Sequence, residues 1–374
     1  MTQVELDAAL DRTWNISVEV SPLAPIPDAP VYDPVRQIVE NGFPITLREL
    51  LHAIGIKTAN LPANQQDAAI NASLKYLHLL DLDGGDLSFL PFEDTDLITT
   101  QSQETGIGIM CLLARRLYHI PWDQIEPLPA PGLRFDYRGR QNGFSGIFES
   151  KGTRNRSTQN SQIRHGLRKK QAHHNRGDVF DVELIISTHI GWQNTAPRIL
   201  VGDPSFDRLA EIYRETDDSF FRLRHYARVL QFIGLPRTSY FLNETAKEEL
   251  PRRKAPPVEQ LPPVVIRQII EEKQEIGYLE PLFYGGQRYV GRWFSTILPP
   301  ESRRYAKTKF RLADKTPYTE PLGTRIFQGL RDDVYQSLIR LAPVSDIARD
   351  QVIELDGMKA SIFADGTIQI FKQD

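Results

Sequence analysis

The segment from Glu104 to Asp203 places the strongest constraint on the fold, because its hydrophobic pattern changes period several times within one continuous stretch. Apolar residues recur at helical spacing over residues 104–118. Two strand-like runs follow on either side of Asn142–Gly143, a dipeptide typical of a tight hairpin turn. A polar stretch that becomes helical near Ser161 then precedes two apolar strands, DVELIIST and RILVGDP. The order helix, strand pair, helix, strand, strand predicts an α/β sandwich.

The residues before this segment predict a separate module. Residues 21–34 are rich in proline, which favours an extended lead-in. Patterns for three helices follow, the second opened by a Thr46–Glu49 capping box and the third covering about residues 64–80, and then a hairpin around Gly84–Gly85. Three helices and a hairpin resemble a winged-helix module, so we expect residues 1–98 to form one.

The rest of the chain is expected to divide into a core, a linker and a C-terminal region. Residues 99–250 would hold the α/β core with a helical extension, and the proline-rich stretch 251–263 reads as a linker. Residues 264–374 are expected to form an α+β region. Its predicted elements include a helix over about 324–341 and a terminal antiparallel pair with turns at two Asp–Gly dipeptides.

Charge is distributed unevenly along the chain. The formal net charge is only -3, yet residues 1–100 hold 15 acids and 5 bases, whereas residues 101–176 hold 5 acids and 13 bases. The change of sign near residue 100 therefore suggests a domain boundary. Phosphates would repel the acidic N-terminal module, whose third helix has Lys75 as its single base. A protein partner is the favoured role for that module, with nucleic-acid contact as the alternative.

The sequence shows no sign of secretion or membrane insertion. Cys111 is the single cysteine, so no disulfide can form within the chain. The longest apolar stretch, residues 107–114, is far shorter than the roughly 20 residues that cross a bilayer. A cytoplasmic location without membrane contact is the expectation.

Three residues in and beside the predicted hairpin could carry chemistry. Glu149 and Lys151 lie two residues apart on one strand and therefore emerge on the same side, and Asp136 on the preceding strand could lie beside Glu149. Two carboxylates that close repel each other unless a cation neutralises them, and hard oxygen ligands suit Mg²⁺. Lys151 could then activate water or stabilise charge on phosphorus. The alternative is a salt bridge on an exposed strand face.

These residues resemble the motif of the PD-(D/E)xK nuclease superfamily, in which an aspartate-bearing strand, an E-x-K strand and a basic helix follow a helix that often bears glutamate. The resemblance covers residues 104–203 and implies a restriction-endonuclease-like αβα core. It implies Mg²⁺, or Mn²⁺ as a substitute, held by Asp136, Glu149 and the Ser150 carbonyl, with Lys151 as base or charge stabiliser. The resemblance also implies that Glu104 is a further metal ligand, unless this residue only stabilises the start of its helix. It implies that Gln171 contacts the site or the substrate.

A run of basic residues follows the E-x-K strand. Residues 151–176 hold eight Lys or Arg and no acid, which suits phosphate binding, although a solvated loop and helix would have the same composition. The expected DNA contacts are Arg154, Arg156, Arg164, Arg168, Lys169 and Lys170. The sequence therefore predicts a metal-dependent DNA endonuclease, with restriction or anti-phage defence as a setting and a homodimer as an expectation because two strands must be cut. The alternative is a nucleic-acid-binding or assembly subunit that retains the fold without turnover.

Overall fold

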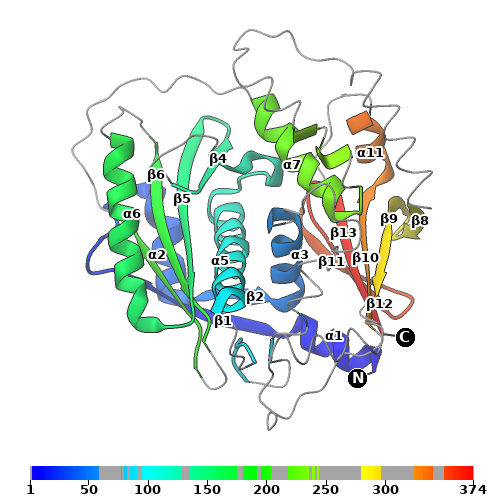
Figure 1. The fold of residues 1–374 in the computed structure, drawn as a ribbon, viewed down its shortest axis with the longest axis horizontal. Helices are drawn as coiled ribbons and strands as arrows, with labels where there is room; N and C mark the ends of the chain where they lie inside the picture. The colour runs from blue at the N-terminus through cyan, green and yellow to red at the C-terminus, as the bar shows by residue number, and fades with distance from the viewer. Residues whose placement is uncertain are drawn as a thin grey trace.

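The structure is a computed structural model in which mixed α/β elements form two sheets (Figure 1). It describes residues 2–58, 77, 80–81, 85–90, 95–128, 135–174, 180–191, 195–203, 218–235, 238–240, 242–243, 279–295, 324–339 and 349–373.

The first sheet has seven strands in the order β2-β1-β7-β6-β5-β4-β3. Strands β3, β4 and β5 form an antiparallel meander, β5 pairs in parallel with β6, and β1 pairs in parallel with β7. Their bounds are β1 Thr13–Val20, β2 Phe43–Thr46, β3 Ile125–Pro127, β4 Tyr137–Gln141, β5 Phe144–Thr153, β6 Val182–His189 and β7 Arg198–Gly202. The parallel step from β5 to β6 needs a crossover, which helix α6 (Gln159–His174) supplies.

Helices cover both faces of this sheet. Helix α6 packs on one face, while α2 (Asp33–Asn41) and α5 (Thr95–Tyr118) lie on the other (Figure 1). Helix α3 (Leu47–Thr58) lies between α5 and the second sheet, and α7 (Asp218–Phe232) packs against α3. The short 3₁₀ turns are η1 Pro30–Tyr32, η2 Trp122–Gln124 and η3 Arg156–Thr158.

The second sheet is antiparallel and strongly curled. Its six strands follow the order β11-β12-β13-β10-β9-β8. The hydroxyl of Tyr284 on the edge strand β8 lies 2.8 Å from the carbonyl oxygen of Ile353 and 2.7 Å from that of Met358, near the opposite edge. Its elements are β8 Glu280–Tyr284, β9 Gln287–Ser295, β10 Thr324–Arg331, α11 Asp332–Ile339, β11 Gln351–Leu355, β12 Met358–Ile362 and β13 Thr367–Gln373.

The two ends of the chain meet at the second sheet. Helix α1 (Gln3–Asp11) packs against β13, and the Gln3 side-chain nitrogen donates to the carbonyl oxygen of Phe371 at 3.1 Å. The backbone N–H of Gln373 donates in turn to the Gln3 side-chain oxygen at 2.6 Å. One hydrophobic cluster runs from Leu6 through α3, α5 and the first sheet to Phe371.

A chain of buried charges crosses between the two sheets. The Lys57 ammonium donates to the carbonyl oxygens of Trp122 and Ile125, both at 2.7 Å, and also contacts Glu126 and the Nδ1 of His225. An ammonium group only donates, so the His225 Nδ1 accepts in this contact.

This network of buried charges extends further on both sides. Arg228 pairs with Glu126, and His225 Nε2 lies 3.0 Å from Asp365. Two cations and two anions therefore balance inside the protein, as the cost of burying charge requires.

The structure corrects the predicted domain boundaries. Strands β1 and β2 belong to the same sheet as β4–β7, and helix α5 continues across residue 98. Residues 1–98 therefore are not a separate module, and structure begins before the proline-rich stretch 21–34. The capping box at Thr46–Glu49 is confirmed by reciprocal hydrogen bonds. The third predicted helix lies largely outside the described residues, whereas an antiparallel bridge between Leu80 and Phe89 supports the hairpin.

The C-terminal predictions are partly corrected. The helix predicted over 324–341 is instead strand β10 followed by α11, because Ile326, Phe327 and Leu330 are buried within the second sheet. The terminal pair is a three-stranded meander whose turns lie at Asp356–Gly357 and Asp365–Gly366, as predicted. The linker 251–263 lies outside the described residues, but the C-terminal strands share the main core with α1 and α3.

The Asp365 carboxylate makes stability depend on acid pH. Burial raises its pKa, but contacts with His225 and Thr367 outweigh that effect and bring the pKa to about 2, below the ordinary 3.8. A group with a depressed pKa stabilises the fold above its unfolded pKa and loses that contribution as pH falls toward the folded value. We expect this carboxylate to lose roughly 2 kcal/mol of stabilisation between about pH 4 and pH 2.

Denaturant unfolding of Asp365→Asn at the two pH values tests this expectation. The variant should lose less unfolding free energy on acidification than the wild type, while the exposed control Glu280→Gln should follow the wild type. An identical decrease in the wild type and Asp365→Asn would contradict the assignment.

Candidate active site

The hairpin β4–β5 brings the two predicted carboxylates together. Asn142 and Gly143 at its turn have φ values of 41° and 85°, the left-handed pair that a tight hairpin turn requires. Tyr137 pairs with Phe148, so the next step of the antiparallel register places Asp136 opposite Glu149. Side chains at directly opposite positions share one face of a sheet. The predicted hairpin and the neighbourhood of its two acids are therefore confirmed.

Two lysines hold this carboxylate pair. The Lys151 ammonium lies 2.7 Å from Glu149 Oε1 and 3.5 Å from Asp136 Oδ2. The Lys169 ammonium, from α6, lies 2.7 Å from Asp136 Oδ1, 2.7 Å from Glu149 Oε1 and 2.8 Å from Glu149 Oε2. Both carboxylates thus contact a single nitrogen atom. We call these four residues the carboxylate–lysine cluster.

Burial sharpens the electrostatics of the cluster. The Glu149 side chain is 0% exposed, whereas that of Asp136 is 32% exposed, so the cluster opens to solvent on the Asp136 side. Burial and the neighbouring Asp136 charge raise the pKa of Glu149, although the lysines act against this. Burial lowers the pKa of Lys151, but the two carboxylates outweigh it and raise that pKa above the ordinary value. Lys151 is therefore a cation here, suited to stabilising negative charge rather than accepting a proton.

Helix α6 places two predicted DNA contacts inside the protein. Lys169 and Lys170 were expected to contact phosphates, but both are buried. Lys170 pairs with Asp203 and lies 3.6 Å from Glu183, on the side of α6 that packs on β6 and β7. Asp203 also accepts from the Tyr32 hydroxyl at 2.5 Å. Lys170 therefore anchors the helix, and the sequence-based assignment of both lysines to a DNA surface is wrong for this state.

Gln171 and Glu104 do not join the cluster. Gln171 is exposed and lies about 200° around the helix axis from Lys169, so it does not reach the cluster; its contact with substrate stays a prediction. Helix α5 packs on the face of β5 opposite to the Glu149 side chain, with Gly106 against Gly152. Glu104 lies about 160° around α5 from Gly106, which does not suit a metal ligand.

Sequence analysis missed two residues that position the cluster. His173, buried on α6, accepts a hydrogen bond from the backbone N–H of Phe135 at 3.0 Å and so fixes the residue before Asp136. Gln162, also on α6, donates to the Gly152 carbonyl oxygen at 3.1 Å and accepts from Ser187 at 2.6 Å. Both lie at helical spacing with Lys169, and that spacing is the sequence signal that could have identified them.

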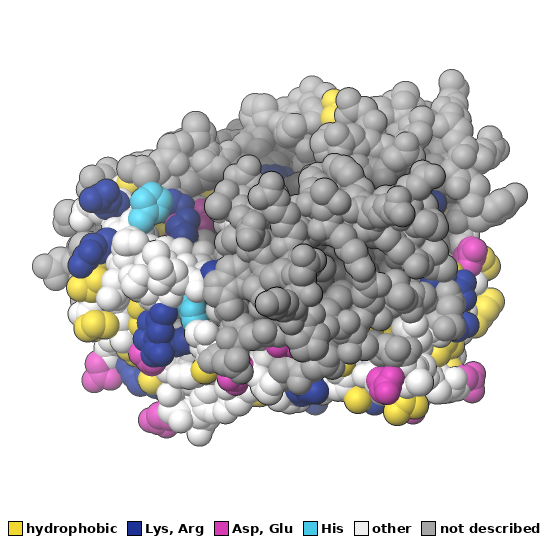
Figure 2. All heavy atoms as spheres, turned by 60° about the horizontal axis from the view of Figure 1, so that its bottom comes forward, with side chains coloured by type: hydrophobic (Ala, Val, Ile, Leu, Met, Phe, Trp, Pro, Cys, Tyr) yellow, Lys and Arg dark blue, Asp and Glu magenta, His cyan; other side chains and the backbone are white. Residues whose placement is uncertain are grey.

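The basic residues that remain exposed lie on one side of α6. Arg164 and Arg168 are exposed on the helix, and Arg156, just before it, contacts Glu19 at 3.3 Å but remains 58% exposed. Lys, Arg and His side chains gather on the α6 side of the molecule (Figure 2). Arg154 is the exception, because it is buried with its guanidinium 4.3 Å from the ring centre of Phe89. Its predicted DNA contact is therefore corrected.

The donor atoms of the cluster fit a divalent cation of the Mg²⁺ type. Asp136 and Glu149 offer hard oxygen ligands, and Mg²⁺ commonly uses one or two protein carboxylates while retaining water and substrate oxygens. Ser150 lies between Glu149 and Lys151 in the sequence, and its backbone N–H donates to Asp136 at 3.3 Å. The role of its carbonyl oxygen as a metal ligand stays a prediction. Among the described residues no group of three His, Cys, Asp or Glu side chains could hold a metal.

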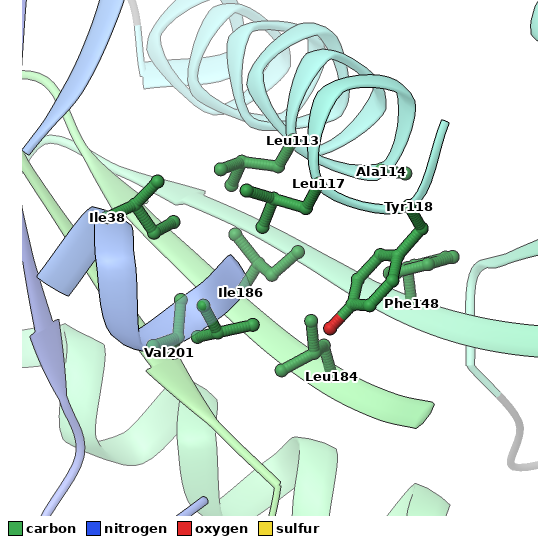
Figure 3. A pocket seen from close by; sticks show the side chains of 10 residues that line it. Ile38, Leu113, Ala114, Leu117, Tyr118, Phe148, Leu184, Ile186 and Val201 are labelled. Carbon is green, nitrogen blue, oxygen red and sulfur yellow. The ribbon is translucent and has the colours of Figure 1, made fainter. Parts of the chain in front are cut away.

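The other face of the sheet is lined by apolar side chains where the structure describes it. There Leu113, Leu117 and Tyr118 of α5 face Leu184, Ile186 and Val201 across a space too narrow for a water molecule (Figure 3). The Tyr118 hydroxyl points into this space and has no hydrogen-bond partner among the described residues; burial raises its pKa. This apolar packing supports β5 from behind, and the carboxylate–lysine cluster lies on the α6 side.

Comparisons with protein-family models, curated proteins and solved structures found no match for this chain. In the part of the chain that the structure describes, no helix is long and apolar enough to cross a membrane.

The close packing of α5 on β5 leads to a stability prediction at Gly152. A Cβ atom on this residue would lie 1.6 Å from the backbone oxygen of Ser102, a contact that no side-chain rotation relieves. We expect Gly152→Ala to lower the free energy of unfolding by at least about 3 kcal/mol. Gly85→Ala, where nothing lies within 4 Å of the added atom, is the matched control and should change stability by less than about 0.5 kcal/mol. Equal stability of both variants in denaturant titrations would contradict the packing.

Proposed function

We propose that this protein is a divalent-metal-dependent endonuclease that hydrolyses DNA phosphodiester bonds. The observation that carries the proposal is the convergence of Asp136 and Glu149 on one ammonium nitrogen, beside Lys151 on the same face. Two carboxylates at this separation can share one divalent cation. Asp136 lies just before strand β4, and Glu149 and Lys151 lie on β5, which are the places where the nuclease resemblance expects them.

The fold around the cluster supports the same proposal. Helix α5, the strand after Asp136, the E-x-K strand and basic helix α6 follow one another in the order that the PD-(D/E)xK superfamily shows. Helices lie on both sides of the sheet, in agreement with an αβα core. Phosphodiester hydrolysis in such a site needs the cluster to open toward the DNA, and it opens at Asp136.

Each residue has a definite task in the proposed reaction. Asp136, Glu149 and the Ser150 carbonyl would hold Mg²⁺ or Mn²⁺, which when bound polarises the phosphoryl oxygen and lowers the pKa of water. Lys151, a cation in this site, stabilises the negative charge that develops on the phosphoryl oxygens. Arg156, Arg164 and Arg168 bind neighbouring phosphates of the duplex.

A second candidate function rests on a specific observation. Lys151 and Lys169 already neutralise both carboxylates, so the cluster is complete as a structural ion-pair network. A DNA-binding or assembly subunit without catalytic turnover could bind phosphates through the same exposed arginines of α6. Metal-dependent cleavage distinguishes the two functions.

Plasmid cleavage tests the proposed activity. We expect supercoiled plasmid to be cut in Mg²⁺ or Mn²⁺ and left intact in EDTA. Asp136→Ala and Lys151→Ala should lower the rate at least about a hundredfold, because each removes a metal ligand or the charge-stabilising cation. Glu280→Gln, an exposed carboxylate on the second sheet, should retain wild-type activity. DNA binding without cutting in any of these metals would support the binding subunit instead.

The exposed bases of α6 predict the salt dependence of DNA binding. Each lost phosphate contact lowers the slope of log affinity against log salt by about 1. We therefore expect Arg164→Ala/Arg168→Ala to bind duplex DNA more weakly and to reduce that slope by about 2 in fluorescence anisotropy. Arg288→Ala, an exposed arginine of the second sheet, is the matched control. An unchanged slope in the double variant would place the DNA elsewhere.

A further inference from the structure

Lys169 occupies the position between the carboxylates where a divalent cation would bind. Its ammonium lies within 2.8 Å of three carboxylate oxygens, two on Glu149 and one on Asp136. The side chain is 11% exposed and comes from α6, a different element from the hairpin that carries the acids. A flexible lysine side chain can leave this position without moving the hairpin.

Charge balance shows why the lysine and the metal exclude each other. Two carboxylates and two ammonium groups make the cluster neutral, and Glu149 is fully buried. Adding a divalent cation to this arrangement would place three cations around two acids and leave a net charge of +2. If Lys169 leaves, the net charge is +1, which the single negative charge of one phosphodiester balances.

Lys170 provides an internal comparison. It is also buried and also contacts two acids, Glu183 and Asp203, but its partners are 7% and 1% exposed. The Tyr32 hydroxyl and the Glu183 N–H donate to Asp203 as well, so that second pair is sealed by the core. The pair around Lys169 differs because Asp136 is partly open to solvent.

The side chain of Lys169 has a destination beside the cluster. His165 lies one helical turn earlier on α6 and is exposed. Arg168 is exposed on the neighbouring position of the same helix. A displaced Lys169 would therefore join an exposed basic surface.

We propose that Lys169 is a built-in counter-cation, which holds Asp136 and Glu149 together without metal and competes directly with the divalent cation. On metal binding its ammonium leaves the carboxylates and joins the basic face of α6. This inference rests on the proposed metal site, but metal affinity can be measured without any cleavage of DNA.

Calorimetric titration of the full chain with MnCl₂ alone tests the competition. Lys169→Met should bind Mn²⁺ at least about tenfold more tightly than the wild type, because no ammonium has to be displaced. Lys169→Arg keeps the cation and gains a bidentate geometry, so its affinity should equal or fall below that of the wild type. Lys359→Met is the matched control. Lys359 lies on β12 of the second sheet and pairs with Asp11 and Glu354, so its loss should not alter Mn²⁺ binding at the cluster.

Thermal unfolding gives an independent measurement. Without metal, Lys169→Met should melt at a lower temperature than the wild type because its two carboxylates repel each other. Mn²⁺ should raise its melting temperature by more than it raises that of the wild type. If Lys169→Met does not fold without metal, recovery of its circular dichroism by Mn²⁺, and not by NaCl of equal ionic strength, supports the competition; absence of recovery overturns it.

The outcomes separate this inference from the proposed activity. Equal Mn²⁺ affinity in the wild type and Lys169→Met, or no binding to either, overturns the counter-cation role. Tighter binding by Lys169→Met together with no cleavage by the wild type keeps the counter-cation role and rejects the nuclease.

Discussion

Buried charge governs how this chain is assembled, because every charge removed from water needs a partner placed by another element. One network of side chains meets between the two sheets, and its charges neutralise one another. Its members are Lys57 from α3, Glu126 from β3, His225 and Arg228 from α7, and Asp365. A second network joins Arg48 of α3 to Asp7 and Asp11 near the N-terminus. Removing one member would leave an uncompensated charge in a low-dielectric interior. The relative position of the sheets therefore depends on electrostatics as well as on apolar packing.

The carboxylate–lysine cluster follows the same rule with one difference. Its four charges also cancel, but Asp136 is partly exposed, so solvent reaches this cluster, as the proposed exchange of Lys169 for a metal ion requires. Apolar side chains of α5 support strand β5 from behind. From α6, His173 holds the backbone just before Asp136, and Gln162 holds the end of β5 at Gly152. A rigid frame around an exchangeable cation is what a metal-dependent site needs.

Local sequence signals predicted the elements that carry the cluster. The Asn142–Gly143 turn fixes the register of the hairpin, and the register places Asp136 opposite Glu149. Long-range pairing was not predictable in this way, because nothing near Thr13–Val20 indicates that this strand pairs with residues 198–201. The charge reversal near residue 100 was misleading for the same reason: composition reports solvation along the chain, whereas the sheet joins segments of either sign. Lys169 and Lys170 looked alike in sequence, and only the packing of α6 shows that they serve two different acid pairs.

The contact between helix α1 and strand β13 has a consequence for the rate of folding. Strand β1 needs β7 as its parallel neighbour, and Gln3 bonds to Phe371 and Gln373 in the last strand. The bonded residues Gln3 and Phe371 are 368 positions apart along the chain, and Gln3 and Gln373 are 370 apart. Contacts of such long sequence separation cost much chain entropy before they contribute stability, so the docking of helix α1 on strand β13 is expected to be a slow step of folding.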